Sequence, residues 1–145
     1  MLKWWLGALM VLCCGMSFAA REVMPEEEFA FTLNRLLAQC ELRGMELYLR
    51  MDVAPSRKEK KRREKEGYDE ARLCFEEKLN AAKKEYREAV AKFPRLKDDY
   101  RDIYALWLMA MDDYTIPHDV SYESQRKENF DFAVKKFFAR LHAEP

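Results

Sequence analysis

Apolar residues recur in steps of three and four along most of this chain, and this spacing is the feature that most constrains its fold. Residues spaced in this way lie on one face of an α-helix, whereas a half-buried strand needs strict alternation of apolar and polar residues. The first such stretch begins at Pro25, and the three glutamates that follow oppose the positive end of a helix dipole. We predict a helix from about Pro25 to Asp52, whose apolar face comprises Phe29, Leu33, Leu36, Cys40, Gly44, Leu47 and Met51.

A second stretch repeats the pattern from Arg57 to Phe93 and stops at Pro94, because proline cannot continue a helix. Ser56 precedes this stretch and Glu59 stands three residues later, which is the pattern of a capping box that satisfies exposed backbone N–H groups. The predicted apolar face comprises Tyr68, Ala71, Phe75, Leu79, Ala82, Tyr86, Ala89 and Phe93.

The third stretch runs from about Leu96 to Asp113, and the fourth follows a turn at residues 115–118, with Asp119 or Ser121 as its N-cap. No segment alternates for long enough to make a strand. Because the connections are short, the sequence predicts an all-α fold, a small and mostly antiparallel helical bundle of about four helices. The last two apolar faces comprise Leu96, Tyr100, Ile103, Trp107 and Met111, and Phe130, Val134, Phe137 and Leu141.

The second stretch is too long for a compact body of this size. Unbroken, it would measure about 55 Å at about 1.5 Å per residue, against about 35 Å for the body. The helix must therefore break or project, and Gly67 is the predicted break. Residues 57–66, which contain no apolar residue, are predicted to form a charged arm or loop; opposite charges four residues apart would favour the helical form.

The first 20 residues have the layout of a secretory signal peptide. Lys3 precedes an apolar run from Trp4 to Cys14, and Ser17-Phe18-Ala19 places small residues around a cleavage site. We predict that residues 1–19 are a cleaved signal peptide and that residues 20–145 form a single helical domain, exported to the periplasm or secreted, with no transmembrane span in the mature chain. The alternative, an uncleaved anchor, would have an apolar run of at most about 17 residues.

Removal of the signal peptide leaves two cysteines, Cys40 and Cys74. In an oxidising compartment, two thiols on neighbouring helices tend to form a disulfide. By the chain-entropy estimate, a bridge that closes a loop of this length raises the free energy of unfolding by about 3 to 4 kcal/mol. The alternative, a reactive or metal-binding pair, matches no common zinc spacing. We therefore predict a Cys40–Cys74 disulfide.

A run of basic residues is the most unusual local feature, because the whole chain is balanced at 26 basic and 26 acidic side chains. Such a run can bind phosphate, anionic lipid head groups or an acidic protein, with an attraction that weakens with salt. It lacks aromatic residues for stacking on nucleic acid, and export makes nucleic acid still less suitable, so none is predicted as a partner. The alternative is a solubilising arm. The residues are Arg57, Lys58, Lys60, Lys61, Arg62, Arg63 and Lys65.

The third stretch carries an acidic stripe, because two Asp-Asp-Tyr triplets stand 14 residues apart, close to four helical turns. The stripe is a second candidate binding surface, for a basic partner or weakly for a hard cation, and the alternative is a solvated helix face. No calcium-binding loop is present. The residues are Asp98, Asp99, Asp102, Asp112 and Asp113.

No constellation typical of catalysis is visible, so we predict a non-enzymatic protein without catalytic residues, a metal site or a cofactor. The two histidines, His118 and His142, have no nucleophile or second histidine at helical spacing. The alternative function is a metal- or haem-linked envelope protein, for which His118 beside Asp119 and the Met109-x-Met111 pair are the motivation. The Cys-x-x-Cys-His sequence of c-type haem attachment is absent.

One segment of about 35 residues resembles the LprI-type lysozyme-inhibitor family of small exported bacterial proteins. The family has Leu-Asn at the start of a helix, then a tyrosine, and later a tryptophan followed by Arg-Asp and a cysteine. This chain has Leu79-Asn80, Tyr86, Trp107 and Asp112 in that order, with Met111 in place of the arginine. The resemblance implies a disulfide-bonded helical protein that binds lysozyme or a related hydrolase, with the acidic stripe facing the basic enzyme.

From these features we expect an exported, non-enzymatic helical protein that acts by binding a protein or another cell-envelope component. The partner's identity does not follow from the residues, and lysozyme inhibition is the most specific form of the hypothesis.

Overall fold

The computed structural model describes residues 23–143, and this part of the chain is built from four α-helices without a strand. They are α1 (Glu28–Asp52), α2 (Arg57–Lys92), α3 (Lys97–Asp113) and α4 (Gln125–Ala143), and the short 3₁₀ helix η1 (Pro94–Leu96) joins α2 to α3. The predicted all-α fold is confirmed. The predicted signal peptide, residues 1–19, lies outside the described residues.

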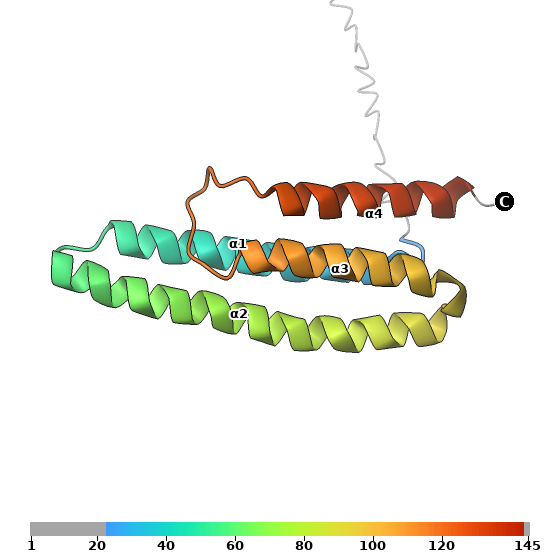
Figure 1. Ribbon diagram of the computed structural model, residues 1–145, viewed down its shortest axis with the longest axis horizontal. Coiled ribbons are helices and arrows are strands. Elements are labelled where there is room, and N and C mark those ends of the chain that lie inside the picture. Colours follow the sequence, from blue (N-terminus) through green and yellow to red (C-terminus); the bar gives the residue numbers. More distant parts are fainter. Residues whose placement is uncertain (1–22, 144–145) are drawn as a thin grey trace, which may run out of the picture.

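The helices make a body with a projecting end (Figure 1). Helices α1 and α2 form a long antiparallel hairpin, α3 returns along it, and α4 packs against α3. Because α3 and α4 are short, they cover only the half of the hairpin where α1 begins and α2 ends. The end of α1 and the start of α2 extend past them as a two-helix projection.

An aromatic core fills the four-helix half. Trp107 is fully buried and donates its indole N–H to the carbonyl oxygen of Leu33 at 2.8 Å. Tyr100, also fully buried, donates its hydroxyl to the carbonyl oxygen of Glu26 at 2.9 Å, and burial raises the pKa of its phenol to about 12. Both residues therefore tie α3 to the chain at or just before α1.

The predicted break of α2 at Gly67 is wrong. The helix continues unbroken for 36 residues, so residues 57–66 are a helical arm and not a loop. Gly67 is buried: a Cβ there would lie 3.2 Å from Met51 Sδ and 3.3 Å from Pro117 Cγ. The missing side chain makes room for packing, and this offsets the lower helix propensity of glycine.

The predicted N-cap of α4 is also wrong. Neither Asp119 nor Ser121 caps this helix; Ser124 does, because its Oγ accepts a hydrogen bond from the backbone N–H of Lys127 at 3.0 Å. The carboxylate of Asp119 instead accepts bonds from the N–H and the hydroxyl of Ser121, at 2.8 and 2.6 Å. These two residues form a local turn that delays the helix start to Gln125.

No helix in the described range is long and apolar enough to cross a membrane.

Candidate functional site

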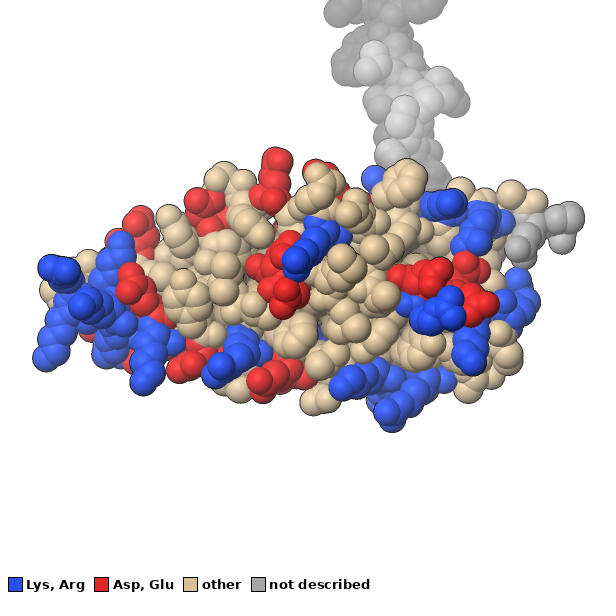
Figure 2. Space-filling view, viewed as in Figure 1, with Lys and Arg blue, Asp and Glu red and all other residues tan. Residues whose placement is uncertain are grey.

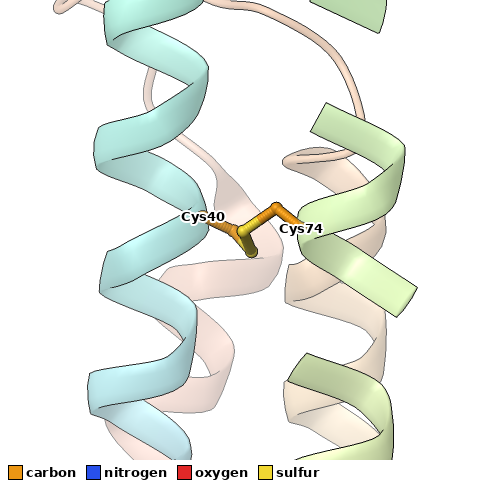
Figure 3. The surroundings of a disulfide bond; sticks show 2 residues. All are labelled: Cys40 and Cys74. Atoms are coloured by element: carbon orange, nitrogen blue, oxygen red, sulfur yellow. A yellow bond between two sulfur atoms is a disulfide. The ribbon is translucent and has the colours of Figure 1, made fainter. Parts of the chain in front are cut away.

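The projecting hairpin is fixed at its base by a disulfide. Cys40 of α1 and Cys74 of α2 are joined, with their Cα atoms 5.8 Å apart, and Figure 3 shows the bridge between the facing helices. The structure thus contains the predicted pair. Cys40 is almost fully buried, so the bridge belongs to the edge of the core.

Charged residues continue the contact between α1 and α2 beyond the disulfide. Arg43 and Arg50, two turns apart on α1, both bind the carboxylate of Glu70 on α2, Arg50 at 2.9 Å. Arg43 also donates to Glu46 at 2.6 Å, and this hydrogen bond lowers the pKa of the Glu46 carboxyl. These four side chains hold the two helices in register where α3 and α4 no longer cover them.

The α3–α4 loop closes over the same region. His118 is only 5% exposed and lies on Gly44 of α1, where a Cβ would come within 2.2 Å of its Cε1 atom. The backbone N–H of His118 donates to the carbonyl oxygen of Gly44 at 3.4 Å. Pro117 lies next to Gly67 of α2 in the same way. The loop therefore packs on two glycines, Gly44 of α1 and Gly67 of α2.

Basic side chains cover the far end of the hairpin, where α2 begins, and Figure 2 shows Lys and Arg gathered there. Two of the seven predicted residues are engaged internally. Arg62 binds Glu59 and Glu66 at 2.5 and 2.7 Å, and Arg63 binds Glu59 and the carbonyl oxygen of Arg50, both at 2.8 Å. The bonds from Arg62 and Arg63 lower the pKa of Glu59 to about 2.

The other five basic residues are exposed and make no ion pair within residues 23–143. Arg57, Lys58 and Lys60 stand at the first turn of α2, where the helix dipole is positive and acidic side chains would be more favourable. Helix stability therefore does not account for the placement of these three residues. We call the group of five the basic end: Arg57, Lys58, Lys60, Lys61 and Lys65.

Val53 is a further residue of this region, and the apolar periodicity of the sequence does not predict it. It follows the last residue of α1 and its side chain is 70% exposed, at the turn that leads into the basic end. A single apolar residue outside every helical stripe carries no periodic signal, so only its position in the fold identifies it.

The acidic stripe divides into two sets. Asp99 binds Arg140 of α4, while Asp112 and Asp113 bind Arg126 of α4 at 2.9 and 3.1 Å. Asp98 and Asp102 are 81% and 70% exposed, and both bind their neighbour Arg101 at 3.0 and 3.2 Å. Three carboxylates therefore connect α3 to α4, and the other two form a small exposed surface.

The residues that motivated a metal site do not come together. His118 and Met111 are buried, Asp119 binds Ser121, and Met109 is half-exposed. Over residues 23–143, no group of three or more His, Cys, Asp or Glu side chains is arranged to hold a metal ion.

No family model, curated protein or solved structure matches this chain. The resemblance to the LprI-type family therefore stays a prediction. Function has to be argued from the surfaces of the molecule, and among those predicted the basic end is the most distinctive.

Proposed function

We propose that this is an exported, non-enzymatic binding protein of the cell envelope and that its basic end attaches to a negatively charged partner. One observation carries the proposal: five exposed cations without internal partners stand together on a braced helical projection. A solubilising arm would serve equally well as a mobile segment. Here the disulfide, the Glu70 network and the α3–α4 loop all hold the projection in one conformation.

Export is supported by the amino-terminal pattern and by the disulfide. A bridge between Cys40 and Cys74 persists in an oxidising compartment, whereas cytosolic thiols are kept reduced. A binding role without catalysis is supported by the positions of the two histidines: His118 packs on Gly44, and His142 pairs with Glu27 at 3.0 Å.

A lysozyme inhibitor is the more specific form of this proposal, and it would use the opposite charge. The acidic stripe offers Asp98, Asp102 and Asp112 as its most exposed carboxylates, each beside an arginine of the same chain. An arginine within hydrogen-bonding distance weakens the field that a basic enzyme would meet. The basic end has no such internal neutralisation, so it supports the broader proposal better. Lysozyme activity that is unchanged by a large molar excess of the protein would dismiss the inhibitor form.

The proposal is tested by capture from envelope extracts at low and high ionic strength. We expect the wild-type protein to retain an anionic component at low salt and to release it at high salt, because exposed charges are screened beyond about 10 Å at about 0.1 M salt. The double variant Lys58→Glu/Lys61→Glu should retain none.

The matched control is Lys83→Glu/Lys135→Glu, which makes the same change in net charge at two exposed positions on the four-helix half. This variant should behave like the wild type. Equal retention by wild type and by Lys58→Glu/Lys61→Glu would overturn the proposal.

A further inference from the structure

We propose that the anionic partner is a lipid membrane surface, with Val53 entering the head-group region while the lysines of the basic end contact lipid phosphates. This inference rests on the proposed function and specifies its partner. Three features of the projecting end support it. They are the exposed apolar residue at its tip, the predominance of lysine among the unpaired cations, and the position of the tip beyond the ends of α3 and α4.

The first feature is the position of Val53. Its side chain is 70% exposed, although most of the aliphatic residues of α1 lie in the core. It is followed by Ala54, Pro55 and the N-cap Ser56 before α2 begins at Arg57, so the turn is uncharged and three of its four residues are apolar. The basic run itself contains no apolar residue, but this turn lies directly before it at the tip of the hairpin. An apolar tip next to cations is the arrangement of a peripheral membrane contact.

The second feature is that two of the three arginines of the run are paired within the described part of the chain, whereas its lysines are not. Arg62 and Arg63, whose planar groups could bind one carboxylate or phosphate in a fixed geometry, are both engaged by Glu59. Four of the five unpaired cations are lysines, which act as mobile point charges. Such a set has little geometric selectivity. It suits a surface with many loosely placed phosphates better than a single acidic protein site.

The lysines also share a direction. Lys58, Lys61 and Lys65 follow one another in steps of three and four, so they lie on one side of α2, and all three are exposed. The distance from Lys58 to Lys65 along the axis is about 10 Å. All three charges can therefore act together on one anionic surface, and each adds to the attraction.

The third feature is the shape of the molecule. The turn between α1 and α2 lies beyond the ends of α3 and α4, so the tip can approach an extended flat surface without the rest of the body intervening (Figures 1 and 2). A hollow near the basic end has a volume of about 290 Å³ and is lined by Arg50, Arg62, Arg63, Glu66 and Glu70 among others. Arg50 pairs with Glu70, Arg62 with Glu66 and Arg63 with Glu59, so this hollow is not a prepared pocket for a small anion.

The inference is tested by co-sedimentation with phosphatidylcholine vesicles that either contain or lack phosphatidylglycerol. We expect binding only to the anionic vesicles and its loss at high salt. Lys58→Gln/Lys61→Gln should weaken binding at least about tenfold, and Val53→Ser should weaken it about threefold or more. Lys83→Gln/Lys135→Gln and Leu42→Ser, which alter exposed residues of other regions, should leave it unchanged. Wild type and variants are compared as the mature protein that remains after removal of the predicted signal peptide, so its apolar run takes no part in vesicle binding.

Insertion of the tip is tested separately with Val53→Trp. The fluorescence of this added tryptophan should shift to shorter wavelength on anionic vesicles and be quenched by lipids brominated on their acyl chains. Trp4 and Trp5 lie in the predicted signal peptide, so the mature protein has one native tryptophan, Trp107, which is fully buried. The wild-type mature protein therefore supplies the background. Absence of quenching would overturn insertion by Val53.

Failure of this inference is distinguishable from failure of the proposed function. No binding to anionic vesicles, together with salt-sensitive capture of an acidic protein by the same basic end, would overturn the membrane inference and leave the proposed function standing. Loss of both activities would overturn both. Vesicle binding that survives Lys58→Gln/Lys61→Gln would also overturn the inference, because the contact would then lie elsewhere.

Discussion

The α3–α4 loop packs on two glycines, Gly44 and Gly67, where an added methyl group would collide with the loop in the first case and be tightly fitted in the second. At Gly44 the collision is severe, because the nearest atoms belong to the ring of His118, which is itself held by the rings of Tyr114 and Tyr122 at 5.0 and 5.3 Å between centroids. At Gly67 the nearest atoms are the sulfur of Met51 at 3.2 Å and Cγ of Pro117 at 3.3 Å, so shifts of a few tenths of an ångström would make room for a methyl group. The two positions therefore differ in what a methyl group would cost.

We predict that Gly44→Ala lowers the free energy of unfolding by about 1 to 3 kcal/mol, the usual cost of overpacking. Gly67→Ala should cost less, because its neighbours need only small shifts and alanine improves helix propensity by about 1 kcal/mol. Urea denaturation of both variants measures the difference. The double variant Gly44→Ala/His118→Ala should be destabilised by less than the sum of its single variants; strict additivity would contradict the proposed contact.

Glu59 gives a pH-dependent prediction at the basic end. Its pKa is about 2 in the folded protein, against an ordinary value of 4.5, because Arg62 and Arg63 donate hydrogen bonds to it. A lowered folded-state pKa contributes stability above the ordinary pKa, and this contribution is lost as pH falls from about 4.5 to about 2. Glu59→Gln should therefore be less stable than the wild type at neutral pH, and the difference should vanish near pH 2.

Parallel urea denaturation of wild type and Glu59→Gln across this pH range provides the measurement. Glu123→Gln, which removes a carboxylate at another exposed position, is a control for general charge effects. A difference between wild type and Glu59→Gln that persists unchanged at the acidic limit would contradict the assignment.

At the scale of the elements, apolar periodicity predicts the helices. It predicts where they end only when a proline or a capping residue marks the same position. Pro94 ends the second predicted helix and α2 stops at Lys92, while Ser56 caps it as expected. The Glu59 carboxylate does not take the role predicted for it in a capping box, because Arg62 and Arg63, one turn further along the helix, bind it instead. Competition between partners of this kind is not encoded in the spacing of residue types.

The two wrong predictions at this scale have one origin, the α3–α4 loop. A break at Gly67 would be expected only if no other segment packed on it. Asp119 would be an N-cap only if the chain entered the helix directly after it. The loop covers Gly67 with Pro117 and uses Asp119 in a turn with Ser121. Both outcomes depend on contacts between segments far apart in the sequence, which local propensity does not contain.

The acidic stripe predicts a graded response to substitution. Asp113 is 18% exposed, accepts a hydrogen bond from the hydroxyl of Ser124 at 2.6 Å and forms an ion pair with Arg126 at 3.1 Å, so it holds the start of α4 against the end of α3. Asp113→Ala should lower stability by about 1 to 2 kcal/mol. Asp98→Ala, at an 81% exposed position, should change it by less than about 0.5 kcal/mol. Thermal denaturation compares them, and equal effects would contradict this division of the stripe.

The disulfide predicts a large change in the stability of the hairpin. Cys40→Ala/Cys74→Ala should lower the free energy of unfolding by about 3 to 4 kcal/mol, from the chain entropy that the bridge removes. Denaturation of the oxidised and the reduced wild type provides an independent comparison. If reduction leaves the unfolding transition where it was, the bridge does not carry this share of the stability.

At the scale of the whole molecule, a four-helix half supplies the core and a two-helix half presents the candidate site. The basic run was predictable from the sequence, because charge density needs no fold to be seen. Which of its members are free was not predictable, since the engagement of Arg63 depends on the carbonyl oxygen of Arg50 across the hairpin. The exposure of Val53 beside the run likewise depends on the way in which α1 and α2 meet.

The central claim is that the basic end, and no other surface, meets an anionic partner. It is tested most directly by following the backbone amide signals of the isotopically labelled protein as anionic lipid bicelles are added. We predict signal shifts and broadening confined to the turn at residues 53–56 and the first three turns of α2, reversed by high salt. Changes centred on the α3–α4 face, or no change at low salt, would contradict the account.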